Sequence, residues 1–405
     1  MELRMPIIII ILSVTSLTTS SSLHEFPSGE YLPADGKVTL RESIDVSVYG
    51  TPLNIEIGRA SFVEADDSQH WRLVLVNTDN ITVLSEGAAP ETIEYSFPAN
   101  RCYYSPDNTY IVLTASRGTV PNAMRVNTDT GEKEVFNCAD GRGIGSLLVS
   151  NKGSVAVLHG GGISFYDEDL NHCNTVTSYR GGGSMIFDMV DDGSVVMYGY
   201  GWTLYGFTGE GEQIWEQADL PVAVQLQRTA ADSDNLKFAV FDAHKIFVIN
   251  AVNGQLLETI DNNNDFMETI MFCPDGSLFY GTFSWTESER FIRIHNYKNN
   301  DNIIGVIVYS IAYGPMRTMS PMSFSDNGIM LYSVEHFPDD RILILADLDG
   351  TVLWSERSRR DANTYTIGGT DFRIPFTSFG ELSDDGTAMC TCIDGRFVVY
   401  GIGAD

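Results

Sequence analysis

Short segments of alternating or continuous apolar residues, separated by polar turns, follow one another along almost the whole chain. Each turn has two or three residues of Ser, Pro, Asp, Asn or Gly, and the segments after the turns are strand-like, as at residues 110–113 and 154–158. Asp-Gly and Asp-Asn between such segments favour tight β-hairpins, because Gly and Asn tolerate a positive φ. No helical periodicity of useful length occurs. The pattern predicts an all-β chain.

The turns recur at a nearly regular spacing. Most neighbouring turns lie 40 to 45 residues apart, and the last two intervals are longer. The turns centre on Asp67, Asp107, Lys152, Asp192, Asp234, Asp275, Asn327 and Asp385. A second hairpin signal follows about 20 residues later in several repeats. Each repeat is therefore expected to contain four short strands, here called A to D.

Four-stranded units that repeat at about 40 residues are typical of the blades of a β-propeller, because one twisted sheet cannot bury both of its faces alone. Eight A–B turns predict eight blades, with seven as the alternative if the degenerate first turn is not a blade. The last repeat offers strands A, B and C before the chain ends at Asp405. Residues 43–49, within a closing region at 37–57, have the alternation to supply the missing outer strand.

Two motifs carry a family resemblance over about residues 58–405. One is the Ser-Pro-Asp-Gly type of turn at 105–107, 273–276 and 383–386, and the other is a D-x-x-G-x-x-x-W-like strand entry at 208–215 and 347–354. The chain resembles the broad superfamily of bacterial propellers with WD40-like, YVTN-like or quinoprotein-like repeats. It lacks the Gly-His and Trp-Asp pairs of true WD40 repeats, and it lacks an adjacent Cys-Cys pair and a Cys-x-x-Cys-His haem motif. The motifs mark the fold and are shared by many functions.

The first 22 residues have the three parts of a secretory signal peptide. Arg4 precedes an apolar run from Met5 to Val14, and small hydroxylated residues follow. Ten apolar residues are too few to span a bilayer. We expect export to the periplasm or the extracellular space, with a single propeller domain at 23–405 and no membrane insertion after cleavage. The net charge of −29 repels polyanions, so nucleic acid is not expected as a partner.

Cysteine, histidine and acidic residues give little sign of a metal or catalytic centre. Six cysteines in 405 residues are too sparse for a disulfide scaffold, and buried small hydrophobes are the simpler interpretation. The seven histidines are scattered, which is typical of surface or hydrogen-bonded core residues. No cofactor is predicted. Calcium is the ion left open, because Asp261, Asn263 and Asp265 resemble the start of a calcium loop, although Phe266 replaces its glycine.

The family resemblance implies that the D–A connections and B–C turns meet at the usual ligand-binding end of a propeller. Arginine and aromatic residues stand on the Gly-rich loops expected there. Both residue types provide a large contact area, and arginine pairs bidentately with carboxylates. The candidate ligand-binding residues are Arg117, Arg142, Arg180, Tyr200, Trp202 and Trp285.

The sequence contains no Gly-x-Ser-x-Gly, His-Glu-x-x-His or phosphate-loop motif. We therefore predict an exported, monomeric, non-enzymatic propeller that binds a protein or peptide or serves as an envelope scaffold. A metal-dependent propeller hydrolase or lactonase is the first alternative. A carbohydrate-binding propeller, with Trp202 and Trp285 stacking on sugar rings, is the second.

Overall fold

The computed structural model describes 10–11, 24–25, 38–49, 53, 59–65, 68–116, 118–138, 143–177, 185–200, 203–217, 220, 228–242, 244–261, 266–273, 276–285, 289–297, 301–310, 319–336, 340–347, 352–359, 364–367, 370–373, 380–393 and 396–403. These residues are almost entirely strands and turns, as the alternating pattern predicts. They form eight four-stranded antiparallel sheets and two small two-stranded pairs. The chain divides into two compact units, the middle unit (47–261) and the terminal unit (1–46 with 262–405).

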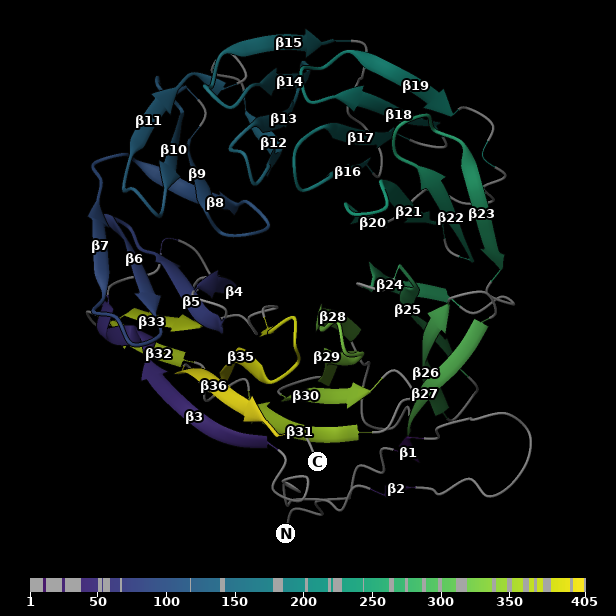
Figure 1. The fold of residues 1–405 in the computed structure, drawn as a ribbon. Helices are drawn as coiled ribbons and strands as arrows, with labels where there is room; N and C mark the ends of the chain where they lie inside the picture. The colour runs from purple at the N-terminus through teal and green to yellow at the C-terminus, as the bar shows by residue number, and fades with distance from the viewer. Residues whose placement is uncertain are drawn as a thin grey trace. The chain divides into compact units, whose positions relative to one another are not determined.

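The middle unit contains five four-stranded sheets, each made from four strands that are consecutive in sequence (Figure 1). The strands are β4 (Arg59–Ala65), β5 (Ser68–Val76), β6 (Asn80–Ser85), β7 (Glu91–Glu94), β8 (Ala99–Tyr104), β9 (Tyr110–Ala115), β10 (Ala123–Asn127), β11 (Lys133–Phe136), β12 (Ile144–Val149), β13 (Val155–His159), β14 (Gly162–Tyr166), β15 (His172–Val176), β16 (Met185–Met189), β17 (Val195–Tyr200), β18 (Thr203–Thr208), β19 (Gln213–Gln217), β20 (Arg228–Asp232), β21 (Lys237–Phe241), β22 (Lys245–Asn250) and β23 (Leu256–Asp261). The strands β4 and β5, which flank the degenerate first turn of the sequence, therefore belong to a complete four-stranded sheet, β4–β7.

The terminal unit contains the other three four-stranded sheets. Its strands are β1 (Ile10–Ile11), β2 (His24–Glu25), β3 (Val38–Asp45), β24 (Phe266–Phe272), β25 (Leu278–Trp285), β26 (Glu289–Tyr297), β27 (Asp301–Ser310), β28 (Met319–Phe324), β29 (Ile329–His336), β30 (Asp340–Asp347), β31 (Val352–Arg359), β32 (Thr364–Ile367), β33 (Thr370–Arg373), β34 (Gly380–Leu382), β35 (Ala388–Ile393) and β36 (Arg396–Ile402). A β32–β33 hairpin precedes the last sheet and was not predicted from the sequence.

The last sheet takes its outer strand from the N-terminal part of the chain. The strand order is β3-β36-β35-β34, and β3 pairs antiparallel with β36 from Val38 opposite Ile402 to Asp45 opposite Arg396. The origin of the missing strand is thus confirmed, but its predicted bounds are wrong. The strand lies at 38–45, and Val46–Tyr49 forms a 3-10 turn in which Val46 is buried.

The core of the middle unit lies between neighbouring sheets. One hydrophobic cluster joins Val74 and Ile81 of sheet β4–β7 to Ile111 and Met124 of sheet β8–β11, and similar clusters follow at the next three seams. Strands B and C are the most buried, whereas the D strands expose alternate residues. The apolar strand positions are therefore those that face a neighbouring sheet, as expected for the radial packing of a propeller.

A serine makes the same pair of hydrogen bonds in several of the A–B turns. In sheet β8–β11, the Ser105 hydroxyl donates to Asp107 and accepts the Tyr110 amide. Ser325 and Ser383 make the corresponding bonds in the terminal unit. The serine at the end of strand A thus holds each of these hairpins closed, because its oxygen satisfies backbone donors that the tight turn leaves unpaired.

Among the described residues, no helix is long and apolar enough to cross a membrane.

Candidate functional site

The B–C loop and the D–A connection of one sheet lie at the same end of that sheet, because its strands are antiparallel. In sheet β8–β11 this is shown by two register pairs. Ala99, at the start of strand A, pairs with Ala115 at the end of strand B, and Ala123 of strand C pairs with Phe136 of strand D. The loop after Ala115 and the connection after Phe136 therefore meet at the end where the sequence predicts ligand binding.

The buried side-chain amide of Asn122 joins these two segments through hydrogen bonds. The Nδ2 of Asn122 donates to the Cys138 carbonyl oxygen at 2.7 Å, and the Cys138 amide donates to Asn122 Oδ1 at 2.6 Å. The Ala115 amide also donates to the Asn122 carbonyl oxygen at 2.9 Å. Both Asn122 and Cys138 are buried, and burial raises the pKa of the Cys138 thiol to about 12. These bonds tie Asn122, at the base of the loop, to Cys138 and to the end of β9.

The fastened loop carries an exposed apolar side chain. Val120 is 70% exposed, although the two ends of its loop are hydrogen-bonded to the sheet. A solvated valine on a loop whose base is hydrogen-bonded to the sheet is suited to contact with another molecule, because the contact would bury apolar area. This loop and the connection that begins at Asn137 form the candidate functional site.

Two of the predicted aromatic residues lie at the expected ends of their own sheets. Tyr200 is half-buried at the end of β17, opposite Thr203 of β18, so it stands at the B–C end of its sheet. Trp285 is the last residue of β25 and stands opposite Arg290. The two belong to different units, so each is placed only within its own sheet.

The remaining predicted ligand-binding residues, Arg117, Arg142, Arg180 and Trp202, lie outside the described residues. So do Asn263 and Asp265 of the suggested calcium loop. Asp261, the first residue of that loop, closes β23 and forms an ion pair with Lys245 at 3.6 Å. Across the part of the chain that the structure describes, no three His, Cys, Asp or Glu side chains are grouped so as to hold a metal ion.

Two histidines have the hydrogen-bonded core role expected for scattered histidines. His159 accepts the Gly161 amide at Nδ1, so its Nε2 carries the proton and donates to Ser164 Oγ at 2.9 Å. His295 is buried, with Nε2 3.0 Å from Thr282 Oγ1 and its ring stacked on Tyr280. Both are fixed by their neighbours within the sheet.

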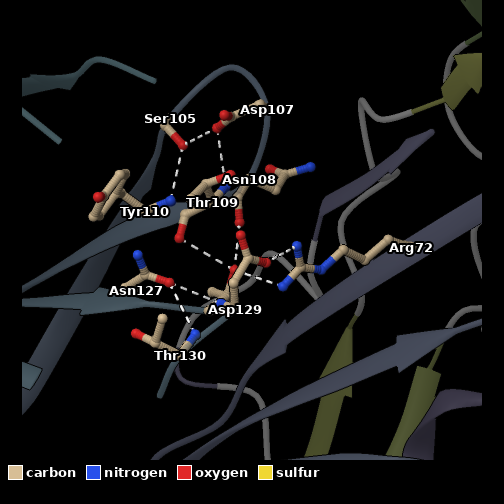
Figure 2. A network of polar contacts seen from close by, with 10 residues as sticks. Arg72, Ser105, Asp107, Asn108, Thr109, Tyr110, Asn127, Asp129 and Thr130 are labelled. Carbon is tan, nitrogen blue, oxygen red and sulfur yellow. Dashed lines mark hydrogen bonds and ion pairs between the residues drawn. The ribbon is translucent and has the colours of Figure 1, made fainter. Parts of the chain in front are cut away.

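Two buried arginines were missed in the sequence. Arg72 of β5 reaches the C–D turn of the next sheet, where it donates to Thr128 Oγ1 at 2.8 Å and forms an ion pair with Asp129 (Figure 2). Arg125 of β10 reaches the following sheet and donates to the carbonyl oxygens of Gly153 and Glu168, both at 2.6 Å. Nothing in the local sequence distinguishes them from surface arginines, because their partners in the neighbouring sheets are 28 to 57 residues away.

Two of the C–D turns share one construction. The last residue of strand C accepts backbone amides of the turn through its side-chain oxygen, as Asn127 does for Asp129 and Thr130. Asn250 does the same for Val252 and Asn253. The turns predicted by the second hairpin signals at Asp129 and Asn253 are therefore contacted by a side chain from the preceding sheet, Arg72 and Trp215 respectively.

One innermost strand carries a carboxyl group with an unusual environment. Asp188 of β16 accepts the Met189 amide at 2.9 Å and the hydroxyl of Thr229, on β20 of the next sheet, at 3.2 Å. The pKa of Asp188 is raised to about 6, because burial and the neighbouring Asp191 raise it by more than the two hydrogen bonds lower it. This carboxyl group therefore titrates within the range of ordinary buffers.

No family model matches the sequence, and no curated protein does. Among solved structures, the chain is similar to the C-terminal WD40 domain of Sif2, with a TM-score of 0.56 and 11% identity. The alignment covers 91% of this chain and 99% of that one. This likeness and the sheets establish a β-propeller of four-stranded antiparallel blades with WD40-like structural similarity. At this identity the likeness concerns the fold alone.

Proposed function

We propose that this chain is an exported, non-enzymatic β-propeller that binds a protein or peptide at the end of its blades where the B–C loops and D–A connections lie. The observation that carries the proposal is the fastened 116–122 loop, with buried Asn122 at its base and exposed Val120 near its tip. The eight four-stranded sheets, closed by β3, support a count of eight blades.

The net charge of −29 favours a basic partner. An acidic surface attracts a cationic peptide at long range and raises its association rate, and salt screens this attraction. The contact at Val120 would then add a short-range apolar component that salt does not weaken. A basic peptide with an apolar anchor combines both properties.

The test begins with selection of random peptides displayed on phage against the purified chain 23–405. Affinities of the enriched peptides are then compared between the wild type and Val120→Asp by fluorescence polarisation. Val48→Asp is the matched control, because Val48 lies in the same unit and is also 70% exposed. We expect Val120→Asp to weaken binding at least about tenfold, because the apolar anchor of the peptide would meet a hydrated carboxylate in place of the valine side chain, while Val48→Asp leaves it unchanged.

Equal losses in both variants would exclude the 116–122 loop as the binding surface. Failure to enrich any peptide would count against the peptide-binding function itself. Turnover of ester, lactone or glycoside substrates by the purified chain would favour a propeller hydrolase instead.

Export is tested separately. Residues 1–22 are fused to a phosphatase that is active only after translocation, and a fusion lacking residues 5–14 serves as the control. Activity of the first fusion alone is the expected result, because the apolar run is the part that the export machinery recognises. Equal activity of the two fusions, or activity in neither, would contradict an exported protein.

A further inference from the structure

Two buried polar side chains face the seam between sheets β4–β7 and β8–β11 and have no hydrogen-bond partner within the described part of the chain. They are Ser61, through Oγ, and Asn108, through both Oδ1 and Nδ2. Ser61 is 8% exposed and Asn108 is fully buried. An unsatisfied buried polar group costs about 1–3 kcal/mol, so three such atoms at one seam call for an explanation.

Strand pairing places Ser61 on the seam. Ser61 of β4 stands directly opposite Arg72 of β5, and directly opposite residues of an antiparallel pair project from the same face of the sheet. The Arg72 side chain crosses to the next sheet, where it bonds Thr128 and Asp129. The Ser61 hydroxyl therefore projects towards that same sheet.

Hydrogen bonds place Asn108 on the other side of the seam, in sheet β8–β11. The Thr128 hydroxyl that accepts Arg72 donates in turn to the Asn108 carbonyl oxygen at 2.8 Å. Arg59, two residues before Ser61, donates to the Ser105 carbonyl oxygen of the same A–B turn at 3.4 Å. Figure 2 shows the Asn108 side chain pointing away from the bonds of its own turn, towards the side from which Arg72 enters.

The turn fixes Asn108 in this orientation. Its φ is +60°, in the left-handed region that asparagine tolerates better than most residues. The Ser105 hydroxyl and the Asp107 carboxylate satisfy the neighbouring amides of Tyr110 and Thr109. The side chain of Asn108 takes no part in these turn bonds, although it is buried at the seam.

The unpartnered atoms themselves indicate the chemical class of the ligand. Asn108 offers one acceptor and one donor group, and the Ser61 hydroxyl can act as either. A cation would satisfy Oδ1 but leave Nδ2 unpaired, and the nearby Arg72 guanidinium would repel it. An anion would satisfy Nδ2 but leave Oδ1 unpaired. Water both donates and accepts, so it alone satisfies the whole set.

We propose that this seam is a structural water site, in which at least one buried water bridges the Ser61 hydroxyl and the Asn108 side-chain amide. The water links the first two sheets of the middle unit at their inner strands, next to the outer link made by Arg72. Buried waters of this kind make about three hydrogen bonds to otherwise unsatisfied groups, which matches the atoms available here.

Crystallography of the chain 23–405 at about 2 Å resolution or better tests the site directly. We expect a density peak about 2.7–3.2 Å from both Ser61 Oγ and the Asn108 amide. Crystals soaked in sodium bromide or rubidium chloride distinguish the ligand class, because bromide and rubidium scatter anomalously and water does not. Water density without an anomalous peak supports the proposal. A dry seam, or an anomalous peak at the site, overturns it.

A double-mutant cycle tests the same link in solution. Ser61→Ala removes the hydroxyl group and Asn108→Gly removes the side-chain amide. Glycine adopts the left-handed backbone at position 108 without strain. If one water bridges the two residues, each single change lowers the melting temperature by about 2 °C and the double variant falls by less than their sum.

The control cycle pairs Ser61→Ala with Asn122→Ala. Asn122 is also a buried asparagine, but its amide bonds Cys138 and shares no partner with Ser61. This pair should be additive. Additivity in the Ser61 and Asn108 cycle as well would overturn the bridging water, whatever the size of the single effects.

Discussion

The indole Nε1 of Trp215 donates a hydrogen bond to the backbone oxygen of Ala251 over 2.7 Å, which joins the outer strand of one sheet to the C–D turn of the next. Gly254 of that turn lies against the same ring, since a Cβ at Gly254 would stand 2.7 Å from Trp215 Cδ2. Arg125 meets the turn-forming Gly153 of the following sheet in a similar way. A large side chain from one sheet and a glycine turn from the next thus recur as the link between sheets.

The Trp215 contact predicts a specific cost for Gly254→Ala. The substitution places a methyl group inside the indole ring's contact distance and also strains a backbone with φ of +71°. Gly131→Ala is the control, because Gly131 has the same φ and its nearest atom, Ile93 Cγ1, is 3.9 Å away. We expect both variants to lose about 1 kcal/mol to backbone strain, and Gly254→Ala to lose about 1–3 kcal/mol more through overpacking. Urea denaturation measures the difference, and equal losses would contradict the ring contact.

Arg125 predicts a contrast between buried and exposed ion pairs. Its side chain is 7% exposed and bonds two backbone oxygens as well as Glu134. Arg125→Met should therefore cost about 3 kcal/mol of unfolding free energy, because those buried acceptors lose their donor. Lys152→Met removes a pair with Asp192 whose side chains are more than half exposed, and should change stability by less than about 0.5 kcal/mol. Similar melting temperatures for the two variants would contradict this ranking.

Asp188 predicts a pH dependence of stability. Its folded pKa of about 6 exceeds the usual value of 3.8, so the unfolded chain releases this proton first as the pH rises. The carboxyl group therefore contributes most to stability below about pH 4, and this contribution is lost as the pH rises to 6. In Asp188→Asn the amide stays neutral and can still accept the Met189 amide.

We expect Asp188→Asn to melt at about the same temperature as the wild type at pH 4 and several degrees higher at pH 7. Asp192→Asn is the control, because it changes an exposed carboxylate whose pKa is lowered by the bonds to Ser194 and the pairing with Lys152. A constant difference between Asp188→Asn and the wild type across this pH range would contradict a raised folded pKa.

The cysteines predict an order of thiol reactivity. Cys173 is exposed, whereas Cys138, Cys273 and Cys390 are buried. Burial raises the pKa of both Cys138 and Cys390, so neither forms a reactive thiolate at neutral pH. Mass spectrometry after brief alkylation of the native protein should find Cys173 modified and these three intact, and Cys173→Ser should remove that label. Rapid labelling of Cys138 would contradict the fastened loop at Asn122.

The candidate site was only partly predictable. Connectivity alone places Tyr200 and Trp285 at the B–C ends of their strands, and the structure agrees. The clamp between Asn122 and Cys138 gives no sign in the sequence, because an asparagine in a loop is usually solvated and its partner lies 16 residues later. The ion pair of Asp261 with Lys245 likewise gives no sign in the sequence, because it depends on strand register.

Local patterns along the chain predict the four-stranded repeats, the positions of their turns and the N-terminal origin of the last outer strand. These features depend on local alternation and on residues that tolerate turn geometry, and both can be read along the chain. Only the tertiary structure decided that Arg72 and Arg125 are buried, that Trp215 covers Gly254, and that Asn108 faces a seam. Those outcomes depend on which sheets pack together, because the burial of a side chain is set by neighbours that lie tens of residues away in the sequence.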